Sequence, residues 1–198
     1  MKNKFNIAIF ASGAGSNALK IIQHFQQPSE INISLIISNK AEAGVVEIAN
    51  QNNIRTIILE RKPFFESDKY VLLLKEQNID LIVLAGFLWK IPANLVAAFP
   101  DRIINIHPAL LPKYGGKGMY GNFVHQAVID AKDKISGITI HLVDEQYDHG
   151  KHLFQAECSV VQEDTVESLA QKIHALEHRF LPEVIEKYCQ ALMNNQNS

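Results

Sequence analysis

FNIAIFASGAGSN, the stretch from Phe5 to Asn17, joins a short apolar run directly to a loop that holds two glycines. The run Phe5–Phe10 is typical of a strand buried on both faces. Glycines let a backbone turn tightly and approach a ligand, and a helix that begins after them offers free N–H groups to an anion. We therefore predict that Gly15, Ser16 and Asn17 form a phosphate cradle, although such a turn can also serve packing alone.

The same alternation continues outward from this stretch. Further short apolar runs predict strands at Ile31–Ile37, Thr56–Leu59, Leu81–Leu84, Ile103–Ile106, Ile138–Val143 and Leu153–Val161. Helical periodicity lies between them at Asn17–Gln26, Ala43–Asn52, Asp68–Gln77, Pro92–Phe99 and Gly121–Ala131. Strands that alternate with helices predict an α/β fold with a Rossmann-like, doubly wound, mostly parallel sheet. The two late strands follow one another across a polar turn, so we expect an antiparallel strand in the C-terminal half.

Two features mark the second half of the chain. The segment 107–120 is a long loop without a periodic pattern, and such loops in compact domains are usually functional. Asp164-Thr165-Val166-Glu167 predicts a capping box at the start of a last helical region. Pro182 is expected to break or kink that region.

Composition limits the possible classes of protein. The chain has 198 residues, of which 47% are hydrophobic and 20% charged, as in one ordinary globular domain spanning 1–198. The net charge of −2 gives no basic surface for a nucleic acid. No apolar stretch reaches the roughly 18 residues of a membrane helix, and no signal peptide is visible. Cys158 and Cys189 match neither a zinc cluster nor a redox pair, which favours a reducing, cytoplasmic location.

The expected ligand of the first loop is a monophosphate. A dinucleotide site requires an acidic residue at the end of the second strand, where this chain has Ser38-Asn39-Lys40. The Walker lysine that marks nucleoside triphosphate sites is also absent from the sequence.

Asn105 and His107 stand at the end of the fifth predicted strand, where open α/β sheets bind ligands. Strand alternation directs both side chains to the same side. An amide and an imidazole that converge there can stabilise an oxyanion and move a proton, whereas the alternative is a histidine that only bonds loop carbonyls. Asp148, in the polar turn 144–150, can pair with His107 and raise its pKa, or belong to a solvated turn.

Two further sets of residues admit a functional and a structural interpretation. His141, His149 and His152 lack helical or zinc-site spacing, so we predict no metal site. Trp89, with its neighbours, can line a ligand pocket or pack in the core, and core packing is the more common outcome.

These stretches together resemble the phosphoribosylglycinamide formyltransferase family. The matching residues run in the family's order: Ser12–Asn17, Ala85-Gly86-Phe87, Asn105-Ile106-His107-Pro108-Ala109-Leu110-Leu111-Pro112-Lys113-Tyr114, Gly137–His141, Asp148-His149-Gly150 and Glu177-His178. The block that ends Leu-Leu-Pro-Lys-Tyr is highly specific.

The resemblance implies an enzyme that transfers the formyl group of 10-formyltetrahydrofolate to the amine of 5-phosphoribosylglycinamide (GAR) in de novo purine (IMP) biosynthesis. It implies a catalytic trio of Asn105, His107 and Asp148, phosphate contacts from Gly15, Ser16 and Asn17, and Glu177 on the amine and ribose side of GAR. The folate contacts that it implies are Leu88, Trp89, Lys90, Ile91, Asn105, Asp144, Glu145, Gln146 and Tyr147. Residues 1–100 then form the phosphate-binding half and 101–198 the folate and catalytic half.

The resemblance also implies small-molecule substrates, no metal and either a monomer or a homodimer. This chain departs from some members by lacking an arginine near Ser67, by carrying Trp89-Lys90 in the pocket segment, and by a glycine-rich stretch at 114–123 where His125 has no clear counterpart. Other interpretations stay open: another 10-formyltetrahydrofolate-dependent formyltransferase or hydrolase of the same fold, or a non-catalytic nucleotide-binding module.

Overall fold

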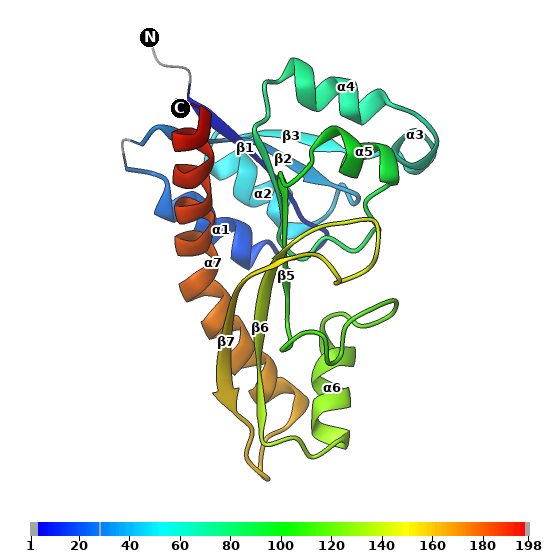
Figure 1. Ribbon diagram of the computed structural model, residues 1–198, viewed down its shortest axis with the longest axis vertical. Coiled ribbons are helices and arrows are strands. Elements are labelled where there is room, and N and C mark those ends of the chain that lie inside the picture. Colours follow the sequence, from blue (N-terminus) through cyan, green and yellow to red (C-terminus); the bar gives the residue numbers. More distant parts are fainter. Residues whose placement is uncertain (1–3, 28, 197–198) are drawn as a thin grey trace.

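The computed structural model describes residues 4–27 and 29–196. Within these ranges the strands form one sheet in the order β3-β2-β1-β4-β5-β6-β7 (Figure 1). They are β1 (Phe5–Phe10), β2 (Ile31–Ser38), β3 (Arg55–Ile58), β4 (Leu81–Leu84), β5 (Ile103–His107), β6 (Ile135–Leu142) and β7 (His152–Ser159). β1 to β5 pair in parallel, whereas β6 runs antiparallel to both β5 and β7. The predicted mostly parallel α/β sheet with a reversed strand in the C-terminal half is therefore confirmed.

Helices cover both faces of this sheet. They are α1 (Ser16–His24), α2 (Gly44–Gln51), α3 (Arg61–Glu66), α4 (Lys69–Glu76), α5 (Ala93–Ala98), α6 (Asn122–Asp130) and α7 (Val166–Gln196). α1, α2 and α7 contribute to one buried apolar cluster, and α3, α4 and α5 to a second one on the opposite face (Figure 1).

β1 lies between these two clusters and contributes to both. Ile7 and Ile9 belong to the cluster under α1 and α7, whereas Ala8 and Phe10 belong to the cluster under α3 to α5. Successive side chains of a strand point to opposite faces, so a strand covered on both sides must be apolar throughout. This is why the run Phe5–Phe10 is apolar except for the half-buried Asn6.

α3 is a helix that the sequence pattern does not predict. It is short, so it shows no clear 3.6-residue period, and it contains Pro63. Pro63 is the third residue of α3, within the first turn, where backbone N–H groups have no partner inside the helix. Proline is tolerated there because it removes no helical hydrogen bond.

Of the two expected effects of Pro182, a break or a kink, the break is wrong, because α7 continues through this residue to Gln196. A proline inside a helix costs about 3 kcal/mol. Leu181 and Ile185 on either side are fully buried. Each such side chain contributes about 1.5–3 kcal/mol, so packing offsets the cost of the proline.

The N-terminus of α7 is capped one residue later than predicted. The Ser168 N–H donates to Thr165 Oγ1 at 3.2 Å, and the Thr165 N–H donates to Ser168 Oγ at 2.9 Å. Asp164 instead accepts the Val161 N–H. The capping box therefore joins Thr165 with Ser168 rather than Asp164 with Glu167.

The centre of the sheet creates a crevice. β1 and β4 are neighbours, but the chain leaves β1 toward β2 on one side and leaves β4 toward β5 on the other. Loops that diverge in this way leave space at the carboxyl ends of the strands. Ser12 joins the two loops, because its N–H donates to Gly86 O and its Oγ accepts the Leu88 N–H at 2.9 Å.

Among the described helices, none combines the length and the hydropathy that crossing a bilayer requires.

Gly15 is the position at which the first loop depends on glycine. Its φ is +80°, and a Cβ there would lie 2.8 Å from Val45 Cα. We expect Gly15→Ala to lower the free energy of unfolding by about 2 kcal/mol, because a left-handed backbone is unfavourable for alanine and α2 would have to shift. Urea denaturation followed by circular dichroism measures this change.

Gly13→Ala is the matched control, since no atom lies within 4 Å of the position of its Cβ. We expect it to change the free energy of unfolding by less than about 1 kcal/mol. Equal destabilisation by both variants would contradict this account of the loop.

Candidate functional site

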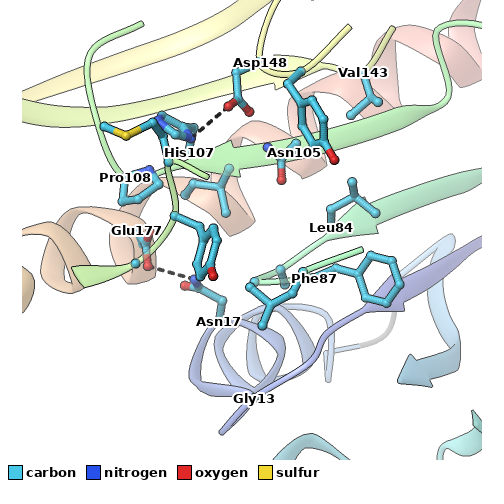
Figure 2. Close-up of a pocket in the computed structure, with 18 of the residues that line it drawn as sticks. Gly13, Asn17, Leu84, Phe87, Asn105, His107, Pro108, Val143, Asp148 and Glu177 are labelled. Carbon is cyan, nitrogen blue, oxygen red and sulfur yellow. Dashed lines mark hydrogen bonds and ion pairs between the residues drawn. The ribbon is translucent and has the colours of Figure 1, made fainter. Parts of the chain in front are cut away.

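A pocket of about 410 Å³ opens at the carboxyl ends of β1, β4 and β5. The loop after β1, the segment after β4, the end of β5 and part of α7 all line it (Figure 2). The glycine-rich stretch before α6 and the turn between β6 and β7 also contribute. Residues from both halves of the chain therefore meet around one cavity.

The structure brings most of the predicted site residues to this pocket. The residues that line it are Gly15, Ser16, Asn17, Leu88, Trp89, Lys90, Ile91, Asn105, His107, Asp144, Gln146, Tyr147, Asp148 and Glu177. Glu145 does not line the pocket and its side chain is exposed. The sequence could not show which way the side chain at 145 faces, because the turn 143–151 has no regular period.

His107 and Asp148 lie side by side in this pocket. Figure 2 shows the two side chains facing one another. His107 Nδ1 is 3.6 Å from Asp148 Oδ2, and the side chains are 4% and 11% exposed. The Nε2–H of His107 donates to the carbonyl of Tyr114 at 2.8 Å. The Gly116 N–H donates to Asp148 Oδ2 at 2.9 Å. Since Nε2 is held by a carbonyl, Nδ1 is the ring nitrogen of His107 that can exchange a proton with the pocket.

Asp148 has an unusual backbone conformation, with φ at +53°. Aspartate adopts this left-handed region more readily than most residues, but it remains an uncommon conformation. The hydrogen bond from Gly116 and the two neighbouring imidazoles fix the carboxylate in this orientation. A strained residue held in this way at a pocket is a frequent feature of functional sites.

His141 orients Asn105, a role that the sequence did not reveal. The Nδ1–H of His141 donates to the Leu142 carbonyl at 2.8 Å, so a neutral ring leaves Nε2 as an acceptor. The Asn105 amide donates to that nitrogen at 3.1 Å. Asp148 Oδ1 also lies 3.7 Å from His141 Nε2. In the register of β6 on β5, His141 lies opposite Asn105. The sequence alone does not give this register, so it could not predict the contact.

Burial lowers the pKa of His107, and it outweighs the opposing effect of the Asp148 carboxylate. The expected effect of Asp148 is present, since its charge raises the His107 pKa, but burial is the larger effect and the net change is a lowering. Burial alone would raise the pKa of Asp148, but nearby His141, His107 and the Gly116 N–H together lower it. The open pocket thus holds an ionised carboxylate beside a mostly neutral imidazole at pH 7.

The predicted phosphate cradle has an open helix terminus. Gly15 precedes α1 and no side chain caps the helix, which leaves its first N–H groups available to an anion. Asn17 Nδ2 donates to Glu177 Oε2 at 2.9 Å (Figure 2). Asn17 Oδ1 is buried and has no partner among the described residues. An unsatisfied buried oxygen in a pocket favours a ligand that donates a hydrogen bond to it.

Two more histidines line the pocket, and the sequence patterns did not identify them as site residues. His174 lies three residues before Glu177 on α7, and its Nδ1 is 3.0 Å from Glu177 Oε2. Residues three apart on a helix are neighbours on its surface, so the spacing of His174 and Glu177 could have indicated this contact. His125 of α6 is buried, and its Nδ1 has no partner within the described ranges. Burial lowers the pKa of His125.

One wall of the pocket is aromatic. Trp89 lines the pocket and also packs against Phe64, with ring centroids 5.6 Å apart, so it serves both alternatives considered for it. The guanidinium of Arg61 stands 5.4 Å from the Trp89 ring centre, and Lys90 Nζ stands 5.2 Å from that of Tyr147. This wall suits a flat aromatic ligand with anionic substituents.

Within the described ranges, no group of three or more histidine, cysteine, aspartate or glutamate side chains is arranged to hold a metal ion. His149 instead pairs with Asp144 at 2.8 Å.

The sequence and the overall structure resemble those of known proteins. The family described as formyl transferase matches residues 5–185. The protein of Bacillus subtilis named phosphoribosylglycinamide formyltransferase is 34% identical over 185 residues, which cover 91% of this chain and 92% of that protein.

A relative in Arabidopsis thaliana, named phosphoribosylglycinamide formyltransferase, chloroplastic, is 40% identical over 93% of this chain. The chain spans about 65% of the length of that relative. The crystal structure of phosphoribosylglycinamide formyltransferase from Anaplasma phagocytophilum superimposes with a TM-score of 0.86 at 36% identity, covering 94% of this chain and 87% of that one.

The geometry around His107 predicts a measurable change in its pKa. We expect Asp148→Asn to lower the His107 pKa further, because the variant removes the charge that favours the imidazolium while burial remains. Titration of the histidine ring nitrogens by NMR measures the shift. Asp144→Asn is the control, since Asp144 pairs with His149 instead. A His107 pKa that rises or stays constant in Asp148→Asn would contradict the assigned pairing.

Proposed function

The chain belongs to the formyl transferase family, and we propose that it transfers the formyl group of 10-formyltetrahydrofolate to the amine of GAR. The products are formyl-GAR and tetrahydrofolate, in de novo purine (IMP) biosynthesis. The observation that carries the proposal is one pocket in which an uncapped helix terminus, an Asn105–His107–Asp148 group and an aromatic wall lie together. A phosphorylated amine and a pterin-containing donor require these three surfaces.

The two substrates are assigned to opposite ends of the pocket. The phosphate of GAR binds at Gly15, Ser16 and Asn17, where the helix N-terminus favours an anion. Glu177, which accepts the Asn17 amide, lies on the amine and ribose side of GAR.

The folate occupies the other end, along residues 88–91 and the turn 144–147, with Asn105 between the two substrates. Trp89 supplies an aromatic surface there, and Lys90 on Tyr147 supplies a positive charge. Among these residues, Glu145 has the least structural support as a folate contact, because it does not line the pocket.

The reaction then follows from the positions of the three central side chains. The amine of GAR attacks the formyl carbon, and the carbonyl π electrons become the oxyanion of a tetrahedral intermediate. The Asn105 amide stabilises this oxyanion, and His107 does so once it has accepted a proton from the amine; such interactions are often worth several kcal/mol. The bond from carbon to N10 of the folate breaks as the carbonyl re-forms.

The proton that the attacking amine loses is transferred to the folate nitrogen that leaves. His107 Nδ1 faces Asp148 at 3.6 Å while its Nε2–H is held by Tyr114. Nδ1 is therefore the position that accepts a proton, and Asp148 stabilises the imidazolium that results. The lowered pKa of His107 keeps it able to accept that proton at neutral pH.

We also propose that the two halves of the chain contribute different parts of the site. Residues 1–100 supply the phosphate cradle, and 101–198 supply the catalytic and folate side, within one catalytic domain over 1–198. The bond between Asn17 and Glu177 joins the two halves at the phosphate cradle. We also predict small-molecule substrates, a monomeric or homodimeric state and a cytoplasmic location.

A formyl-transfer assay tests the proposal. With 10-formyltetrahydrofolate, we expect tetrahydrofolate release that requires GAR and is not supported by charged initiator tRNA. Release without any acceptor would instead indicate a hydrolase of the same fold. No release from folded protein would leave a non-catalytic nucleotide-binding module.

We expect His107→Ala and Asp148→Asn each to lower kcat by roughly two or more decades, given the usual size of acid–base and oxyanion effects. His152→Ala is the control, because His152 is exposed on β7 and does not line the pocket. Steady-state kinetics with GAR measure the change. Near-wild-type kcat in both pocket variants would overturn the assignment of the trio.

A further inference from the structure

We propose that Asp133, which lies outside the pocket, is a positioning residue for His107. It holds Tyr114 so that the Tyr114 carbonyl keeps the ring proton of His107 on Nε2. The inference rests on the proposed function, in which His107 Nδ1 accepts the proton of the attacking amine. It gives a role to Lys113-Tyr114, the end of the specific sequence block, which the proposed reaction does not otherwise use.

Two groups compete for the single ring proton of a neutral His107. The Tyr114 carbonyl lies 2.8 Å from Nε2, and the Asp148 carboxylate lies 3.6 Å from Nδ1. A carbonyl and a carboxylate both only accept hydrogen bonds, so a neutral ring can donate to one of them at a time. The contact at 2.8 Å has the length of a hydrogen bond, whereas 3.6 Å is too long for one. The Tyr114 carbonyl therefore keeps the proton on Nε2 and leaves Nδ1 as the acceptor.

The backbone of Tyr114 needs support from its surroundings to hold this carbonyl. Its φ is +58°, in the left-handed region that is uncommon for tyrosine, and such a conformation persists where other contacts impose it. Thr139 Oγ1 accepts the Leu111 N–H at 2.9 Å and so holds the loop as far as Leu111. Residues 112–116 that follow belong to no helix or strand. The contacts of the Tyr114 side chain therefore determine where its carbonyl points.

The side chain of Tyr114 is held both at its hydroxyl and at its ring. The hydroxyl donates to Asp133 Oδ2 at 2.7 Å. The ring packs on the apolar cluster under α1 and α7, and Lys113 Nζ stands 5.0 Å from the ring centre. Lys113 Nζ also donates to the same oxygen of Asp133. The two side chains at the end of the sequence block thus meet on one carboxylate.

Asp133 is in turn held in the short connection between α6 and β6. Its N–H donates to the Val128 carbonyl of α6 at 3.3 Å. β6 begins two residues later at Ile135 and pairs with both β5 and β7. The hydrogen bonds from Lys113 and Tyr114 lower the pKa of Asp133, which keeps it ionised at neutral pH as an acceptor for both. Asp133 thus joins the Tyr114 side chain to the start of a strand whose position the sheet fixes.

The segment that begins at Tyr114 also contacts Asp148. The Gly116 N–H donates to Asp148 Oδ2 at 2.9 Å. A Cβ at Gly115 would lie 3.3 Å from Asp148 Cβ, so the backbone passes close to this residue. Three consecutive residues therefore contact the imidazole of His107 and the carboxylate of Asp148 together. A displacement of Tyr114 would alter the surroundings of both groups.

The tautomer of His107 tests the proposal without any substrate. In protein labelled isotopically at the histidine nitrogens, the NMR chemical shift of each ring nitrogen shows whether it carries a proton, and His107→Gln identifies the signals. At about pH 8.5, where the ring is neutral, we expect the proton on Nε2 in the wild type. Asp133→Ala and Tyr114→Phe should each shift the tautomer ratio toward Nδ1–H by roughly fivefold, the equilibrium effect of one hydrogen bond.

Steady-state kinetics measure the consequence for turnover. Both variants should lower kcat roughly tenfold, because fewer rings can accept the proton and the others are less well oriented. The KM for GAR should change less than about twofold, since neither Asp133 nor Tyr114 lines the pocket. Tyr114→Phe keeps the ring and its packing, so it tests the hydrogen bond even if Asp133→Ala does not fold.

Two further variants separate the hydrogen bond from other effects. Asp133→Asn keeps an oxygen that can accept the Tyr114 hydroxyl, so it should restore most of kcat and the wild-type tautomer. Asp130→Ala is the matched control, because Asp130 is an exposed carboxylate on α6 that accepts a hydrogen bond from Gln126. It should match the wild type in both measurements.

Two outcomes would overturn the role of Asp133. One is an unchanged tautomer ratio in folded Tyr114→Phe, even if kcat falls, because the contact would then serve stability alone. The other is an equal change of the ratio in Asp130→Ala. A tautomer change in a protein that does not formylate GAR would reject the proposed reaction alone. Formyl transfer to GAR with an unchanged tautomer in the variants would reject the role of Asp133 alone.

Discussion

The burial of β1 and β4 on both faces at the centre of the sheet is the constraint on which the pocket depends. Ile7, Ile9, Ala8 and Phe10 fill two separate apolar clusters, so β1 can neither slip nor tilt without exposing one of them. The loops after β1 and β4 must then diverge, and Ser12 links them where they do. The position of the pocket is thus a consequence of core packing rather than of any pocket residue.

A second link brings the end of the chain to the same place. Asn17 and Glu177 are 160 residues apart in sequence, and their hydrogen bond is buried. It requires α7 to pack against α1 in one register, which the buried residues Leu181 and Ile185 secure. The site therefore depends on α7 remaining helical through Pro182. A break there would separate the turn that carries Glu177 from the packed part of α7.

The sequence predicted what local patterns determine. Apolar runs located the strands to within a few residues, and alternation along β5 correctly placed Asn105 and His107 in one pocket. It could not place Asp148 beside His107 or His141 beside Asn105, because those contacts depend on the pairing of β6 with β5. The net lowering of the His107 pKa could not be predicted from the sequence, because burial, its largest cause, is not visible there.

His107 and His174 show how one side-chain type can serve two purposes in one pocket. Each ring faces a carboxylate, but His107 is 4% exposed with Asp148 at 3.6 Å, whereas His174 is 55% exposed with Glu177 at 3.0 Å. Desolvation therefore lowers the pKa of His107, and the hydrogen bond raises the pKa of His174. Environments that separate two pKa values in this way assign different roles to chemically identical groups. In the proposed reaction, the neutral ring of His107 accepts a proton, and Asp148 stabilises the imidazolium that results.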